Sequence, residues 1–173
     1  MKPESIFPVH GLKGKQKKGG VMIKKVIYFA IAGIIFCGLA AGNLYASSEA
    51  EAKALVEKAA SFYKANGKDK AFAEYSDPKG QFTKGELYIF VVDMKGLTVA
   101  HGGNARLVGK EMIELKDADG KFFMREIVQT AKEKGSGWVD YKWANPTTKK
   151  VDAKTTYVQK VDDYAFGCGV YKK

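Results

Sequence analysis

Between residues 48 and 66, apolar and polar positions recur with the period of an α-helix. The apolar members of this pattern are Leu55, Ala59, Phe62 and Tyr63. Ser48 and Glu51 form a capping-box pattern at its start, and Asn66 followed by glycine ends it. The pattern predicts a long N-terminal helix, followed by a shorter helix over 68–76.

From residue 85 the sequence becomes rich in residues that favour strands. Residues 85–103 predict a hairpin whose two β-rich runs are separated by the turn residues 93–96. Three more strands are predicted toward the end of the chain, over 138–144, 154–161 and 164–171.

A further helix is predicted between the hairpin and these strands, because Phe123, Ile127 and Ala131 recur at every fourth position before Gly135 and Gly137. Consecutive strands with short connections are usually antiparallel neighbours. The order of elements therefore predicts an α+β fold, in which the helices pack on one side of a five-stranded antiparallel sheet.

The chain has a formal net charge of +10, but the charge is unevenly distributed. Seven lysines and one glutamate give the first 46 residues a charge of +6, which leaves +4 on the rest. That remainder is an ordinary soluble surface without a basic stripe. Nucleic acid is therefore not an expected partner.

The N-terminal segment explains the uneven charge. Lys24 and Lys25 precede an apolar run at 26–42, and Leu44-Tyr45-Ala46 is a plausible cleavage site. Residues 22–46 are predicted to be a signal peptide, or alternatively an uncleaved membrane anchor of about 20 residues. Met22 then becomes the expected start, 1–21 a mis-called extension, and 47–173 a single exported domain, periplasmic or otherwise extracytoplasmic.

The predicted mature chain offers few groups for catalysis or metal binding. Cys168 is its one cysteine and His101 its one histidine, so an internal disulfide and a multi-histidine metal site are excluded. Asp162 and Asp163 are adjacent, so on a strand they would face opposite sides and could not act together as acid and base. Neither an enzymatic activity nor a cofactor is expected.

Aromatic and basic residues late in the chain predict a binding pocket. Tyr141 and Trp143 share one face of their strand by its period of two. The returning strand carries Lys154, two threonines and Tyr157 close by. Rings that bury an apolar tail, beside an ammonium and hydroxyls that hold a carboxylate, suit a small organic acid. Ordinary core packing is the alternative.

Three long segments of the sequence carry a family resemblance: "FTKGELYIFVVDMKGLTVAH", "LVGKEMIELKDADGKFFMREIVQTAKEKGSGWVDYKWANP" and "KTTYVQKVDDYAFGCGVY". Together they resemble the single Cache domain, an extracytoplasmic sensing module, over about residues 49–173. The resemblance implies a PAS-like sheet with a long N-terminal helix and a cavity for small ligands, often short-chain carboxylates. It also implies ligand-binding roles for Tyr88, Phe90, His101, Tyr141, Trp143, Lys154 and Tyr157.

Two features depart from the family pattern. Gly102 and Gly103 stand where proline is common, which is expected to loosen that loop. Only two lysines follow Tyr171, so a membrane receptor or sensor kinase is the expected partner that transmits the signal. The alternative is a structural or protein-interaction domain with a non-functional pocket.

Overall fold

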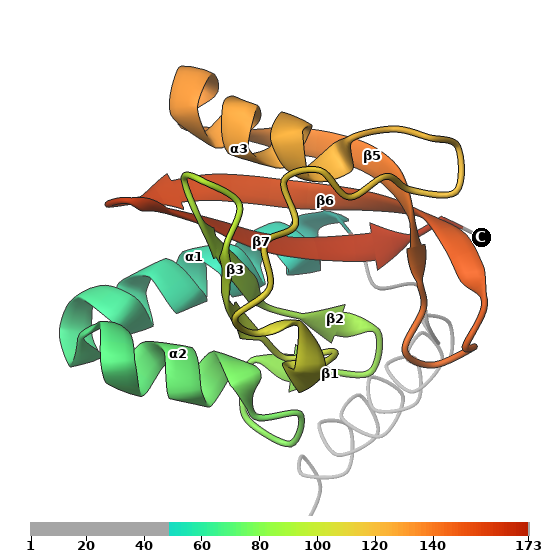
Figure 1. The fold of residues 1–173 in the computed structure, drawn as a ribbon. Helices are drawn as coiled ribbons and strands as arrows, with labels where there is room; N and C mark the ends of the chain where they lie inside the picture. The colour runs from blue at the N-terminus through green and yellow to red at the C-terminus, as the bar shows by residue number, and fades with distance from the viewer. Residues whose placement is uncertain (1–48, 173) are drawn as a thin grey trace, which may run out of the picture. The chain divides into compact units, whose positions relative to one another are not determined.

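The computed structural model describes residues 49–172, which begin with two helices (Figure 1). These are α1 (Glu49–Asn66) and α2 (Lys68–Ser76), separated by Gly67, whose φ of 78° is accessible to glycine at little cost. Both helices lie where the hydrophobic pattern predicts them. The expected cap residue, Ser48, lies outside the described residues.

Five antiparallel strands form the main sheet in the order β4-β3-β7-β6-β5. Their bounds are β3 (Phe90–Asp93), β4 (Thr98–His101), β5 (Ser136–Ala144), β6 (Val151–Val161) and β7 (Tyr164–Tyr171). The predicted five-stranded antiparallel sheet is thus confirmed. The last strand, β7, is its centre and joins the early hairpin to the late strands.

The remaining elements are short or lie beside the sheet. Helix α3 (Phe123–Lys134) ends at Gly135, as the sequence predicts. A small sheet pairs β1 (Thr83–Lys84) with β2 (Leu87–Tyr88), and β2 belongs to the first β-rich run of the predicted hairpin. Strand β1 and the 3-10 helix η1 (Ala105–Leu107) are not predicted.

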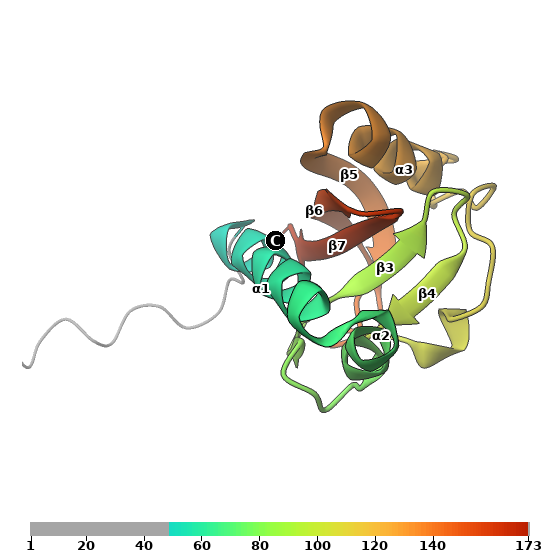
Figure 2. The same cartoon turned by 90° about the vertical axis from the view of Figure 1, so that its left-hand side faces the viewer.

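The helices cover both faces of the sheet, so the expectation that they pack on one side is wrong. Helices α1 and α2 lie against one face and α3 against the other (Figures 1 and 2). Strand β3 shows the reason, because Val91 is buried toward α1 while Phe90 and Val92 are buried toward α3. A continuous apolar run such as "YIFVV" is typical of a strand covered on both sides.

The face beneath α1 and α2, here called the α1 face, has a close-packed aromatic core. Small residues of α1, such as Ala52 and Ala59, are fully buried and allow the helix to lie close to the sheet. The rings of Tyr75 and Phe82 meet edge to face with centroids 4.8 Å apart. The Tyr75 hydroxyl donates a 2.6 Å hydrogen bond to the carbonyl of Ala59.

The opposite face, here called the α3 face, has a second core built on Ile127, Val128 and Ala131 of α3. The residues of both cores are drawn from Ala52 to Val170. Both cores thus lie within the predicted domain, whose bounds of 47–173 stay a prediction. Within the described part of the chain, no helix is long and apolar enough to cross a membrane.

Candidate functional site

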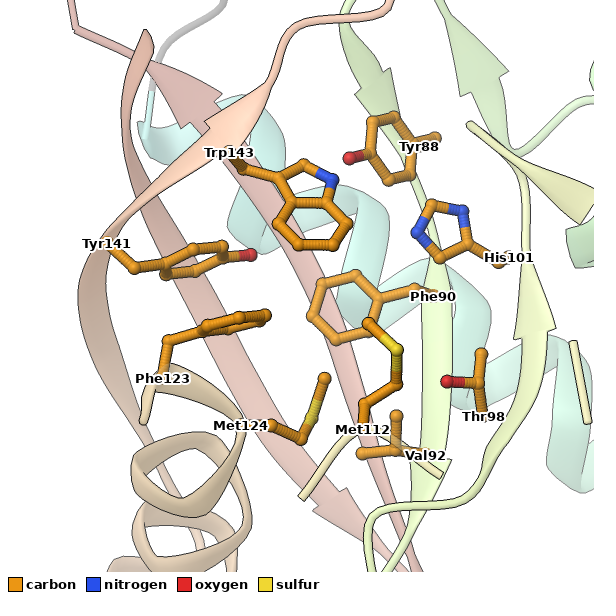
Figure 3. A pocket seen from close by; sticks show the side chains of 10 residues that line it. All are labelled: Tyr88, Phe90, Val92, Thr98, His101, Met112, Phe123, Met124, Tyr141 and Trp143. Carbon is orange, nitrogen blue, oxygen red and sulfur yellow. The ribbon is translucent and has the colours of Figure 1, made fainter. Parts of the chain in front are cut away.

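A pocket opens into the core of the α3 face, between the early hairpin and the late strands (Figure 3). It is lined by Tyr88, Phe90, Val92, Thr98, His101, Met112, Phe123, Met124, Tyr141 and Trp143. Its free volume is about 10 Å³, which is room for about one water molecule. The surrounding side chains largely fill the hollow that the sequence predicts.

Lys154 is a buried cation beside this pocket. Antiparallel pairing sets it directly opposite Tyr141, so both side chains project from the same face of the sheet. Its side chain is almost fully enclosed, and Nζ donates a 2.8 Å hydrogen bond to the hydroxyl of Tyr88. Among residues 49–172, no carboxylate lies within salt-bridge distance of this ammonium.

Aromatic rings compensate part of the cost of burying Lys154. Its Nζ lies 4.1 Å from the ring centroid of Tyr88 and 4.8 Å from that of Tyr171. A desolvated contact of this kind contributes about 2 kcal/mol, whereas removing an ammonium from water costs several kcal/mol. Burial therefore dominates, and it lowers the pKa of Lys154 to about 7.

A directed chain of hydrogen bonds begins at the ammonium. The Tyr171 hydroxyl donates to the carbonyl of Ala144 at 2.8 Å, which leaves its oxygen free to accept. The Tyr88 hydroxyl, which accepts from Lys154, lies 3.4 Å from the Tyr171 hydroxyl and is therefore the donor in that contact. The chain holds Tyr88 with its oxygen turned toward the lysine.

His101 faces the pocket as a neutral ring. Its Nδ1 accepts a 2.9 Å hydrogen bond from the backbone N–H of Asn104, so the proton of the neutral ring is on Nε2. Burial, and next the nearby charge of Lys154, lower the pKa of His101 to about 3. Figure 3 shows the other ring nitrogen directed toward Trp143, in the middle of the pocket.

Tyr141 provides a second neutral donor. Its hydroxyl accepts a 3.0 Å hydrogen bond from Thr156, and its ring stacks on Phe123 with centroids 4.6 Å apart. For its own proton, no acceptor is present within hydrogen-bond distance in the described part of the chain. The hydroxyl points toward Trp143 (Figure 3), and burial raises the pKa of Tyr141 so that the proton stays bound.

Glycines make room for these side chains. A Cβ added to Gly169 would lie 2.5 Å from Cε of Lys154, so only glycine leaves the lysine in this position. A Cβ on Gly103 would lie 2.9 Å from the Tyr88 ring, and one on Gly102 would lie 2.9 Å from the carbonyl oxygen of Tyr75. The glycine pair therefore allows close packing at this loop.

Six of the seven predicted site residues lie together on the α3 face. Tyr88, Phe90, His101, Tyr141 and Trp143 line the pocket, and Lys154 contacts it through Tyr88. Tyr157 does not join them. It is an odd number of residues from Lys154 on the same strand, so it faces α1 and packs against Trp138 at 5.3 Å.

Sequence reasoning missed several residues that line the pocket or contact Lys154, because their elements are far apart in the chain. Met112 comes from the loop after η1, Met124 from α3, and Tyr171 from the end of β7. Tyr171 had a detectable signal, since the antiparallel pairing of consecutive strands could place it beside Lys154. The two methionines had no such signal.

Residues 117–121 form a polar turn before α3. The carboxylate of Asp117 accepts backbone hydrogen bonds from Asp119, Lys121 and Lys142 at 2.9 Å each. The turn is thereby attached to strand β5. No group of three or more His, Cys, Asp or Glu side chains suited to a metal ion occurs within 49–172.

Comparison with known families and sequences agrees with this architecture. The family model for the single Cache domain 2 matches residues 43–172. Over 86 residues the chain is 34% identical to the sensor histidine kinase MctS of Rhizobium johnstonii and 30% identical to the methyl-accepting chemotaxis protein McpP of Pseudomonas putida. These matches cover 49% of this chain but only 18% and 16% of those relatives.

Solved structures share the fold. One, described as the structural basis for carboxylic acid recognition by a Cache chemosensory domain, matches with a TM-score of 0.61 and 26% identity, over 72% of this chain and 92% of that one. A methyl-accepting chemotaxis protein from Vibrio parahaemolyticus matches with a TM-score of 0.62 and 21% identity, over 70% of this chain and 86% of that one.

Proposed function

This chain belongs to the single Cache domain 2 family, and from that premise we propose that residues 47–173 bind a short-chain carboxylate outside the cytoplasm. The family and its relatives are sensory domains of chemoreceptors and sensor kinases. In this proposal the ligand binds in the pocket of the α3 face, and a membrane receptor or sensor kinase reads the bound state.

The observation that carries the proposal is the unpaired ammonium of Lys154. An ammonium has three N–H donors, and within the described residues only Tyr88 accepts from this one. A ligand carboxylate would supply the missing negative charge and accept from the two remaining donors. Charge-assisted hydrogen bonds of this kind are about twice as strong as neutral ones.

The rest of the pocket suits the other end of such a ligand. His101 and Tyr141 each offer a neutral donor, while Phe90, Met112 and Met124 provide apolar walls. Methionine side chains repack easily, so we expect the methionines to move when a ligand enters the small cavity. The confined space favours acids of only a few heavy atoms.

Thermal denaturation of residues 47–173 with acetate, propionate, lactate, pyruvate and amino acids tests the proposal. A ligand at a hundred times its dissociation constant adds about 2.7 kcal/mol to the stability of the folded state. For a domain of this size, we expect the Tm to rise by roughly 10 °C. Unchanged Tm values with every compound at high millimolar concentration would contradict the proposal.

Two matched comparisons show whether a rise in Tm comes from this site. Lys154→Met should abolish the shift caused by the best acid, whereas Lys160→Met, an exposed position on the same strand, should preserve it. Propionamide has the shape of propionate without its charge, so it should stabilise the wild-type domain less than propionate does.

The small volume of the cavity favours a second candidate function. A pocket of about 10 Å³ is also what a protein-interaction domain with a non-functional pocket would have. In that case Lys154→Ala would leave signalling intact, whereas substitutions on the surface of α1 around Leu55 would abolish it. Signalling assays of these variants together with the partner receptor separate the two functions.

The predicted signal peptide and its anchor alternative both fall on residues outside the described part of the chain. We propose that residues 22–46 direct export and are removed. Mass spectrometry of the protein from the periplasmic fraction should then show an N-terminus at residue 47. A membrane-bound product that retains residues 26–42 would support the anchor instead.

A further inference from the structure

We propose that carboxylate binding at this site is coupled to the uptake of one proton by Lys154, so that the domain responds to acidity as well as to its ligand. The inference rests on the proposed function and adds a mode of regulation to it. The species that enters is the carboxylate anion, and the proton comes from solvent. The anion and the proton taken up together have the composition of the undissociated acid.

Within residues 49–172, the geometry around Lys154 contains no carboxylate that holds its proton in place. The titratable groups that influence it come from every strand packed around it: Tyr88 on β2, His101 on β4, Tyr141 on β5, and Cys168 and Tyr171 on β7. Burial raises the pKa of the phenols and of the thiol, and it lowers that of His101, so all of these groups are neutral near pH 7.

The carboxylate that stabilises the charged form of Lys154 does so without direct contact. Glu86, before β2, favours the charged lysine electrostatically but lies beyond salt-bridge distance, like every other carboxylate of residues 49–172. The Tyr88 hydroxyl is the side-chain acceptor for Nζ in this region. A lysine so enclosed releases its proton far more readily than an exposed one.

Ligand binding should oppose the effect of burial on the pKa of Lys154. With its pKa lowered to about 7 by burial, Lys154 in the free domain is about half protonated at pH 7. A carboxylate in contact with Nζ favours the charged form and raises the pKa again. Each anion bound therefore draws a fraction of a proton from solvent, about 0.5 at pH 7 and about 0.9 at pH 8.

The expected effect on affinity follows from the same equilibrium. Above pH 7 the dissociation constant should rise up to about tenfold for each pH unit, because less of the free domain carries the proton that binding requires. Below pH 6 this dependence should disappear, since the lysine is already charged. The sensor would respond most strongly to organic acids under acidifying conditions.

Isothermal titration calorimetry of residues 47–173 tests the inference. Acetate and propionate are titrated at pH 6, 7 and 8, each in two buffers that are effective at that pH and differ in ionisation enthalpy, because the difference in observed enthalpy between buffers counts the protons taken up. We expect uptake to increase from pH 6 to pH 8 while affinity falls. Propionamide, which brings no charge, should bind without proton uptake.

The stability of the ligand-free domain provides a measurement that does not depend on any ligand. Between about pH 7 and pH 10, the unfolded chain, with its ordinary lysine pKa, binds more protons than the folded one. The free energy of unfolding should therefore rise with pH across this window. Lys154→Met should lose that rise, whereas Lys160→Met should retain it.

Two different results separate failure of this inference from failure of the proposed function. Binding of propionate with the same affinity from pH 6 to pH 8, and without proton uptake, would overturn the coupling and leave carboxylate sensing in place. Absence of binding by acetate, propionate, lactate, pyruvate and amino acids at pH 6, where the lysine is charged, would overturn the proposed function and the coupling with it.

Discussion

The two faces of the central sheet bury similar aromatic side chains, but within residues 49–172 the buried lysine lies on the α3 face alone. On the α1 face, the buried hydroxyl of Tyr75 donates to the carbonyl of Ala59 and the surrounding rings pack edge to face. On the α3 face, Lys154 lacks a carboxylate partner among the described residues, and His101 and Tyr141 retain donors without acceptors there.

The difference shows which face carries stability and which carries function. An unpaired buried cation and unused donors cost free energy that ordinary packing avoids. Proteins accept such costs mainly at functional sites. Substitutions on the α1 face should therefore change stability alone, whereas substitutions at polar positions of the α3 face should change ligand affinity.

Phe166→Ala should produce the largest loss of stability. Phe166 is fully buried on the α1 face and contacts the rings of Tyr63 and Tyr75. Loss of such a side chain costs about 3–5 kcal/mol, which denaturation in urea measures. The variant that remains folded should bind propionate as the wild type does. A loss of stability below about 1 kcal/mol would contradict the assigned core.

Lys154→Met should have the largest effect on binding. It removes the one buried cation of the described pocket region, and we expect propionate affinity at pH 6 to fall about 100-fold, or about 2.7 kcal/mol. Stability should stay the same or rise by about 1–3 kcal/mol, because an apolar chain replaces a desolvated charge. Calorimetry and urea denaturation measure the two effects, with Lys160→Met as control.

Tyr75→Phe should have a smaller effect, confined to the α1 face. It removes the hydroxyl that donates to the Ala59 carbonyl, which keeps its backbone hydrogen bond within α1. We expect a loss of about 0.5–1.5 kcal/mol in the free energy of unfolding, without a change in propionate affinity. A change in affinity would show that the two faces are not independent.

Tyr157→Phe should have the smallest effect on stability and on propionate affinity. It tests whether Tyr157 lies outside the binding site. Tyr157 lies on the α1 face, away from the pocket, so its hydroxyl should contribute nothing to ligand affinity. We expect a change of less than about 0.5 kcal/mol in stability.

Tyr88→Phe, which removes the acceptor for Lys154, should by contrast weaken propionate binding. Equal effects of the two variants in calorimetry would contradict this placement.

Local patterns in the sequence were sufficient for most elements of the fold. Helices α1 and α3 follow from helical spacing and from the glycines that end them, because both signals act within a few residues. The turn at Asp162, whose φ of 51° suits a tight hairpin, follows from polar residues between two apolar runs. The family resemblance led to Tyr88, Phe90 and His101, which lie far from β5 and β6 in the chain.

Only the tertiary structure decided which face each of these residues serves. Three features depend on pairing between distant segments, such as β3 with β7: the sheet face that each helix covers, the order of the strands and the volume of the cavity. A shift of one residue reverses the face of a strand residue, so Lys154 and Tyr157 separate although they are three positions apart. The sequence by itself therefore determined the elements and the chemistry available, and long-range packing determined where that chemistry meets.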